Sequence, residues 1–252
     1  MGTSASHGVQ FYPASDQSLL VYFGPQGNPR SSCAEATGSG VPAQNQITTE
    51  GHEQVRRLLQ LMELEPIAGV RNLHPAYGSI LIKFDALKFQ HNELQETLRG
   101  YIDRMEKVAL PEPRLVEIPV CYGGEFGPDL KDVAELHGMP PDRVIALHGS
   151  RPYIVYFLGF VPGFAYLGEL PEELVTPRLS TPRRSVPAGS VGIAGTQTGV
   201  YPISTPGGWR LLGRTPLAMF QSARAQMSML SIGDRVRFVS ISSAQFALWA
   251  NA

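Results

Sequence analysis

Long apolar runs, cysteine and lysine are all scarce in this sequence of 252 residues, and each shortage excludes something. No window holds 18 consecutive apolar residues, so we predict no membrane-spanning helix and no membrane partner. The two cysteines, Cys33 and Cys121, form no close-spaced motif and are interpreted as reduced thiols, which suits a cytoplasmic protein. The first ten residues, MGTSASHGVQ, contain no apolar run and predict no secretory signal.

Motifs for self-contained catalysis are missing as well. The sequence contains neither a GxxxxGK[ST] phosphate loop nor a GxGxxG motif after a strand, so no nucleotide site is visible in it. The six histidines form no HExxH motif or other close pair, and we therefore predict no metal site. No acidic residue lies between Glu173 and Asp234, and no lysine follows Lys131, which excludes paired acids and a lysine nucleophile there. Proton transfer in this region would need another chain.

Arginine is what the C-terminal part has in abundance. From Leu174 onward a single acidic residue, Asp234, stands against eight arginines. Because a guanidinium stays charged when partly buried and binds flat anions through two donors, this pattern fits a carboxylate or phosphate site. A solvated basic face, or a surface that docks an acidic partner, explains it equally well. The eight are Arg178, Arg183, Arg184, Arg210, Arg214, Arg224, Arg235 and Arg237.

Apolar periodicity in the first 110 residues predicts a small α+β domain. The runs at 18–24 and 78–85 alternate as strands do, and residues 25–44, rich in turn formers, are predicted to be a loop. A helix capped by Thr49 is predicted from the apolar stripe that follows it, and a second helix is predicted over 92–107.

The remaining residues, 111–252, are predicted to form a β-rich domain with two short helices near its start. These helices surround Gly138 and resemble a helix-turn-helix, but the second offers only Arg143 and His148 beside Asp142, so we expect no nucleic acid partner. From Arg151 onward short strands alternate with Pro, Gly and Ser, which is typical of a barrel or sandwich. With no helical crossover visible, we expect no parallel sheet.

Four stretches of this second domain resemble a known family. IPVCYGGEFGPDL, YFLGFVPGFAYLGEL, TPRLSTPRRSVPAGSVGIAGTQTGVYPISTPGGWRLLGRTP and GDRVRFVSI are similar to the family of 5-oxoprolinase B subunits. That family is also called allophanate hydrolase subunit 1, or carboxyltransferase subdomains C and D, and it includes inhibitors of sporulation histidine kinases. The resemblance runs from about Glu117 to Ile241 and consists of several long motifs in one order.

The resemblance implies a small N-terminal α+β domain followed by a cyclophilin-like β-barrel. It implies one subunit of an ATP-dependent 5-oxoprolinase, which opens 5-oxoproline to glutamate together with a barrel-like C subunit and a separate A subunit. ATP would then be bound in the assembled complex, and we expect this chain to be inactive alone. The alternatives that remain are a urea- or allophanate-processing carboxyltransferase subunit and a non-catalytic histidine-kinase inhibitor.

Two aromatic turns within the resemblance are predicted to line a pocket or an interface. In FVPGF, proline presets the second position of a type II turn and glycine accepts the positive φ of the third. TPGGW repeats the arrangement. The alternative is that these aromatics cap the ends of the barrel. The residues concerned are Phe160, Pro162, Gly163, Phe164, Tyr166, Gly207, Gly208 and Trp209.

Five further side chains are candidates for contact with a small anionic substrate. Arg178 and Arg183 are predicted to bind its carboxylate or a phosphorylated intermediate, with Gln197 and Tyr201 as polar groups at the pocket edge. His148 is the candidate for proton transfer, although a histidine at a helix C-terminus can also serve only to favour that helix end.

Overall fold

The structure is a computed structural model that describes residues 8–24 and 48–250. The predicted loop over residues 25–44, with Cys33 in it, lies outside the described residues. The chain divides into two compact units, Met1–Pro111 and Glu112–Ala252, and the predicted boundary lies one residue before this division. No helix in the described ranges is both long and apolar enough to cross a bilayer.

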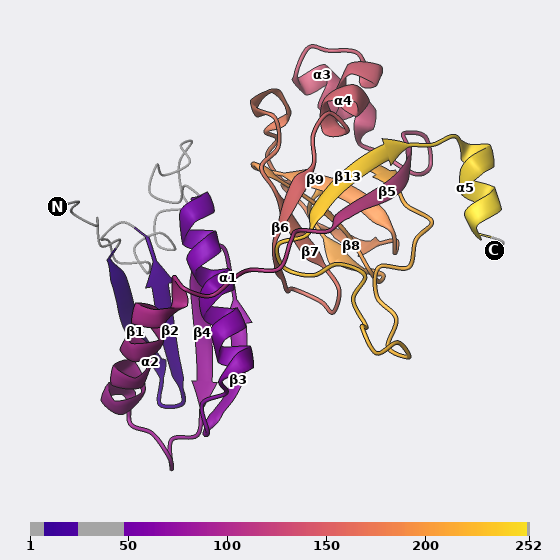
Figure 1. Cartoon of the computed structure of the whole chain (residues 1–252). Helices are drawn as coiled ribbons and strands as arrows, with labels where there is room; N and C mark the ends of the chain where they lie inside the picture. The colour runs from indigo at the N-terminus through magenta and orange to yellow at the C-terminus, as the bar shows by residue number, and fades with distance from the viewer. Residues whose placement is uncertain (1–7, 25–47, 251–252) are drawn as a thin grey trace. The chain divides into compact units, whose positions relative to one another are not determined.

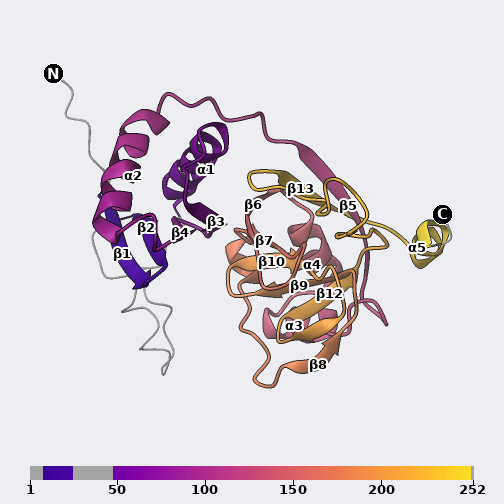
Figure 2. The same cartoon turned by 90° about the horizontal axis from the view of Figure 1, so that it is seen from below.

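The first unit, indigo to magenta in Figure 1, is an antiparallel sheet of four strands in the order β1-β2-β4-β3. Two helices pack against one face of this sheet, as Figures 1 and 2 both show. The strands are β1 (Val9–Ser15), β2 (Ser18–Phe23), β3 (Val70–Pro75) and β4 (Ser79–Phe84), and the helices are α1 (Thr49–Leu64) and α2 (His91–Met105).

Side-chain alternation explains which strands of this unit could be predicted. Ile80, Ile82 and Phe84 of β4 are at most 1% exposed, because every second residue faces the helices. The edge strands β1 and β3 carry mostly half-buried or exposed side chains, and they were not predicted because they lack this pattern. The cap of α1 is Thr48, whose hydroxyl accepts the Gly51 N–H at 3.1 Å, so the prediction of Thr49 was wrong by one residue.

The second unit is a closed barrel of seven strands in the order β10-β7-β6-β13-β5-β12-β9. The α+β class with a C-terminal barrel is thus confirmed. The barrel strands are β5 (Leu115–Tyr122), β6 (Tyr153–Leu158), β7 (Ala165–Gly168), β9 (Ser190–Ala194), β10 (Gln197–Val200), β12 (Arg210–Arg214) and β13 (Arg235–Ser240). A separate two-stranded sheet, three α-helices and a 3-10 turn complete the unit: β8 (Arg183–Val186), β11 (Thr205–Gly207), α3 (Leu130–Leu136), α4 (Pro141–His148), α5 (Ser243–Ala250) and η3 (Glu172–Leu174).

One strand pair of the barrel is parallel, contrary to the expectation from sequence. β5, the first strand of the unit, pairs with β13, the last, in register from Arg235↔Leu115 to Ser240↔Val120. A pairing between segments so far apart in the chain leaves no local sequence signal, and α3, α4 and the other strands form the connection.

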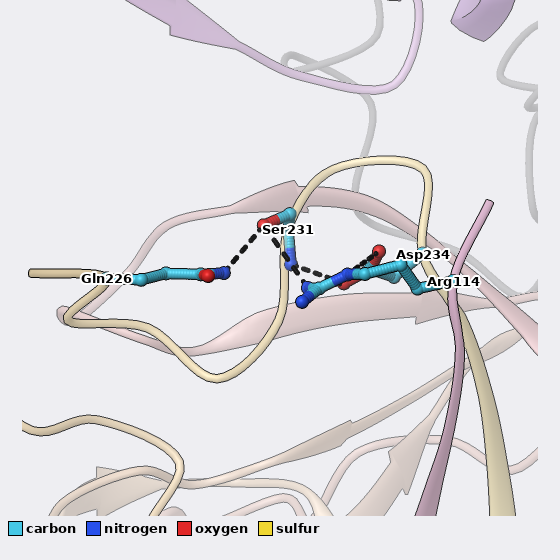
Figure 3. A network of polar contacts seen from close by, with 4 residues as sticks. All are labelled: Arg114, Gln226, Ser231 and Asp234. Atoms are coloured by element: carbon cyan, nitrogen blue, oxygen red, sulfur yellow. Dashed lines mark hydrogen bonds and ion pairs between the residues drawn. The ribbon is translucent and has the colours of Figure 1, made fainter. Parts of the chain in front are cut away.

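An ion pair holds the start of both strands (Figure 3). The Arg114 Nε and Nη2 atoms donate to the two carboxylate oxygens of Asp234 at 3.0 and 2.5 Å. The Ser231 N–H also donates to Asp234, at 2.8 Å, and the Ser231 hydroxyl accepts from the Gln226 amide. The single acidic residue of the C-terminal part therefore serves barrel closure.

Candidate functional site

The turn between β6 and β7 is the type II turn predicted from Val161-Pro162-Gly163-Phe164. Gly163 has φ +82°, and the Phe164 N–H donates to the Val161 carbonyl at 3.1 Å. A Cβ atom on Gly163 would lie 2.7 Å from the Cβ of Phe220, so glycine is required there for space as well as for backbone conformation.

Aromatic rings from three segments meet beside this turn. Phe164 contacts the rings of Tyr166, Tyr201 and Trp209 edge-on, with centroids 4.9 to 5.4 Å apart. Glycine permits the approach, since a Cβ atom on Gly199 would lie 3.1 Å from both the Phe164 and Trp209 rings. The structure therefore brings together side chains that were predicted for one site.

Most of this aromatic cluster is packed as a core. Phe164, Tyr201 and Trp209 are at most 5% exposed, so they contact one another and leave little surface for a ligand. Phe160, which is 60% exposed, and the half-buried Tyr166 are the rings that reach the surface. The alternative of a barrel-capping cluster thus accounts for the three buried rings, and a role in a pocket or interface stays a prediction for the others.

The prediction that TPGGW repeats the type II turn was wrong, because Thr205–Gly207 form the strand β11 and neither Gly207 nor Gly208 has a positive φ. A Cβ atom on Gly207 would lie 2.5 Å from the Tyr201 hydroxyl oxygen, whereas one on Gly208 would come no closer than 3.6 Å to any neighbour. Gly207 is therefore needed for the close packing of β11 over Tyr201. The exposed Pro162 of the first turn lies on the solvent side.

Arg178 lies close to the surface edge of the aromatic cluster. Its side chain is exposed, yet its charge acts on the hydroxyls of both Tyr166 and Tyr201. Burial raises the pKa of each of these two hydroxyls, and the Arg178 guanidinium opposes that rise. An exposed cation beside two tyrosines can receive the carboxylate of a small molecule.

Arg183 has a partner that the sequence did not reveal. Its Nη2 donates to Asp129 Oδ1 at 2.6 Å, and Asp129 Oδ2 accepts the Leu211 N–H at 2.7 Å. Asp129 is 4% exposed and precedes α3, 54 residues before Arg183. The guanidinium is thus held against the barrel by an ion pair, and the substrate-binding role predicted for Arg183 stays a prediction.

Gln197 is not brought together with Tyr201. It begins β10, opposite Gly168, whereas Tyr201 follows the last residue of that strand. A strand rises about 3.3 Å per residue, which separates the two positions by roughly 13 Å. The roles predicted for both residues at a pocket edge stay predictions.

His148 lies inside the barrel, fully buried at the end of α4. Its Nε2 is 2.9 Å from the Thr198 hydroxyl, which itself donates to the Gly192 carbonyl at 3.0 Å. Nε2 therefore carries the proton, and Nδ1 accepts from the Tyr122 hydroxyl at 2.7 Å. The ring also stacks on Phe238, with centroids 4.5 Å apart.

This environment keeps the His148 imidazole neutral. Desolvation lowers the pKa of His148 from 6.5 to about 3, because no acidic group compensates the buried charge. A fully buried ring with both nitrogens engaged favours a structural role, so its predicted part in proton transfer stays a prediction. Burial likewise raises the pKa of Tyr122.

The stability of the second unit should therefore fall in mild acid. Below pH 6.5 His148 of the unfolded chain binds a proton, whereas the folded ring stays neutral until the pH approaches 3. The contribution of the neutral ring to the free energy of unfolding is therefore complete above pH 6.5 and is lost as the pH falls toward 3. The slope approaches about 1.4 kcal/mol per pH unit. Urea unfolding at pH 7.5 and 5.0, followed by tryptophan fluorescence, measures this loss, because Trp209 and Trp249 are the two tryptophans of the chain and both belong to this unit.

The matched control is His148→Gln, which keeps hydrogen-bonding groups but does not titrate. Its unfolding free energy should depend on pH less steeply than that of the wild type. An equal pH dependence in both proteins would show that other groups cause it.

A cavity of about 350 Å³ lies elsewhere on the barrel, between α4 and β13. None of the predicted site residues lines it. Among residues 8–24 and 48–250, no group of three or more His, Cys, Asp and Glu side chains is placed to share a metal ion. The cavity is lined by Tyr122, Ile145, Ala146, Gly149, Arg237, Phe238, Val239 and Ser240.

Three residues that organise this unit were missed by sequence reasoning: Asp129, Thr198 and Tyr122. Asp129 carried a weak signal, since it directly precedes α3 and acidic side chains favour the start of a helix. Thr198 and Tyr122 carried none, because a strand residue with one hydroxyl predicts nothing about its partner across a barrel.

Comparison with known proteins shows which family this chain is similar to. The profile described as carboxyltransferase domain, subdomain C and D, matches residues 9–230. The chain is 59% identical over 193 residues to the 5-oxoprolinase B subunit of Escherichia coli O157:H7, covering 77% of this chain and 87% of that protein. It is 43% identical over 211 residues to the 5-oxoprolinase B subunit of Bacillus subtilis (strain 168), covering 78% and 88%.

Solved structures show the same architecture within longer chains. The crystal structure of TTHA0988 matches with a TM-score of 0.69 and 36% identity over 79% of this chain, which spans only 38% of that protein. Urea carboxylase of Kluyveromyces lactis matches with a TM-score of 0.68 over 98% of this chain and 23% of its own, at 17% identity, which establishes a shared fold alone.

Proposed function

Because the chain belongs to the family of carboxyltransferase domains, subdomain C and D, we propose that it is the B subunit of a cytoplasmic 5-oxoprolinase. In this role it opens 5-oxoproline to glutamate, at the expense of ATP, together with partner subunits. The observation that carries the proposal is the 59% identity to a 5-oxoprolinase B subunit over 87% of that protein's length.

The part of this chain in the reaction is to bind and orient the substrate. 5-Oxoproline is a small ring with one carboxylate, and the exposed Arg178 beside Tyr166 and Tyr201 suits that charge. The buried, neutral His148 makes a poor proton donor at physiological pH. We therefore assign the acid and base groups of ring opening to a partner subunit.

ATP does not fit the residues of this chain. Its sequence contains no glycine-rich phosphate loop followed by lysine, and Arg183 is already bound to Asp129. We therefore assign ATP binding and phosphoryl transfer to a partner subunit as well.

The partners proposed are a C subunit with a similar barrel and an A subunit. The relatives are named as the B subunits of an enzyme, and this naming supports an assembly of several chains. The fold shared with urea carboxylase keeps a urea- or allophanate-processing role as the second candidate. A histidine-kinase inhibitor has no specific observation in its favour.

The purified chain should show no ATP-dependent hydrolysis of 5-oxoproline, whereas the three co-expressed subunits should release glutamate. The reason is that its sequence contains no phosphate-loop motif and no acidic residue between Glu173 and Asp234. Glutamate release from 5-oxoproline measures the first candidate, and consumption of urea in a parallel reaction measures the second.

Two results would contradict this proposal in different ways. Activity of the single chain would show that it contains a complete site. An assembled complex that consumes urea and leaves 5-oxoproline intact would replace the first candidate by the second. Omitting ATP is the control for uncoupled hydrolysis.

A further inference from the structure

Phe160 has a backbone conformation that phenylalanine rarely adopts. Its φ is +68°, and among the described residues every other positive φ belongs to a glycine. The Val161 N–H donates to the Gly159 carbonyl at 2.8 Å, two residues back, so Phe160 is the central residue of a γ-turn with positive φ, a strained form. Such a conformation costs roughly 1–3 kcal/mol in a residue that has a Cβ atom.

The surrounding hydrogen bonds prevent this strain from relaxing. The Gly159 N–H donates to the Phe164 carbonyl at 3.0 Å, which closes the turn from outside. The Phe164 N–H donates to Val161, and Gly163 packs directly on Phe220. Phe160 is thus fixed from both sides.

The Phe160 ring contributes little to the packing of the fold. The side chain is 60% exposed, and its aromatic contact is one edge-on approach to Phe164, with centroids 5.6 Å apart. Glycine would adopt the same backbone without strain, as Gly163 does three residues later. A large apolar side chain that is strained and exposed indicates contact with something outside the chain.

The neighbours of the ring indicate what that contact is. Phe160 touches Phe164, and Phe164 touches both tyrosines whose hydroxyls lie near Arg178. Phe160 and Tyr166 are the rings of this cluster that reach the surface, Phe164 lies between them, and the charge of Arg178 acts on the Tyr166 hydroxyl. This combination matches a small cyclic carboxylate, which has an apolar ring face and one negative charge, better than the flat apolar core of a protein interface.

We propose that the strained turn holds the Phe160 ring as a wall of the substrate site, against the ring face of a small cyclic carboxylate bound by Arg178. This role rests on the function proposed above, and it makes Phe160 the residue that selects for the shape of the substrate.

A pair of variants separates the ring from the strain. Phe160→Ala removes the ring and keeps a Cβ atom at positive φ, whereas Phe160→Gly removes both. The single chain of each variant is unfolded thermally, and each is also assembled with its partner subunits for kinetics with 5-oxoproline. Leu136→Ala, which truncates an apolar side chain that is 55% exposed on α3, is the control for loss of exposed apolar surface.

We expect Phe160→Gly to unfold about 2–5 °C above Phe160→Ala, because only the second variant retains the backbone strain. In the assembled complex both variants should raise KM for 5-oxoproline on the order of tenfold, with assembly unchanged. Leu136→Ala should leave KM within about twofold of the wild type.

Each contrary result has a separate meaning. If the wild-type complex does not open 5-oxoproline, the proposed function fails and this inference fails with it. If the wild-type complex is active and both variants keep its KM, the inference alone is overturned. Weaker assembly with unchanged KM would place the ring at a subunit interface, and equal melting of Gly and Ala variants would show that no strain is stored; either result also overturns it.

Discussion

Replacing Gly127 with alanine should strongly destabilise the second unit. A Cβ atom at this position would lie 1.9 Å from the carbonyl oxygen of Leu212 and 2.2 Å from its carbonyl carbon. Leu212 is fully buried in β12, and the neighbouring Leu211 is held through its N–H and carbonyl by Asp129. Because this backbone cannot retreat, we expect a loss of at least about 3 kcal/mol, measured by urea unfolding with tryptophan fluorescence.

Gly124→Ala is the matched control within the same turn. Gly124 has φ +55°, but a Cβ atom there would meet nothing within 4 Å. Its substitution should cost only the strain of the left-handed conformation, about 1 kcal/mol. If both variants unfolded at the same urea concentration, the close approach of Gly127 to β12 would not be what the fold requires.

Asp129→Asn should destabilise the second unit by about 2–4 kcal/mol. The carboxylate is buried and receives Arg183 on one oxygen and the Leu211 N–H on the other. An amide has a single acceptor oxygen, so its NH₂ group would face one of these two donors. The result would be a buried donor without an acceptor, and urea unfolding at pH 7.5 measures the cost.

Asp132→Asn is the control for removal of a negative charge near α3. Its carboxylate is 63% exposed and lies 3.9 Å from Arg210, so the pair should contribute less than about 0.5 kcal/mol. Equal losses in the two variants would contradict a special role for Asp129. They would also indicate that the bond to Asp129 is not what Arg183 is needed for, which favours the anion-binding role predicted from the sequence.

The sequence predicted those elements whose pattern is local. Alternation marked β4, because one face of that strand is covered and the other is not. The Pro162-Gly163 pair predicted the turn correctly, since the demands of a type II turn fall on two adjacent residues. Family resemblance added that the second domain is a barrel, because the local patterns left a barrel and a sandwich open.

The relations that sequence could not reveal all join distant segments. Arg183 finds Asp129 across 54 residues, and neither position indicates the other. His148 was predicted as a candidate for proton transfer, with its helix end as the alternative, and neither tells whether the ring faces solvent or the inside of a barrel. Gln197 begins β10 and Tyr201 follows its last residue, and the substrate contacts predicted for them stay predictions.

Barrel closure by β5 and β13 has a consequence for synthesis on the ribosome. The Arg114–Asp234 pair spans 120 residues, so β5 emerges long before the strand that it needs. All strands of the first unit pair within that unit, so it can fold completely during translation. The barrel cannot close until β13 has been synthesised, and until then one side of β5 is unpaired. A nascent chain stopped before Arg235 would present that edge to chaperones, proteases and other nascent chains.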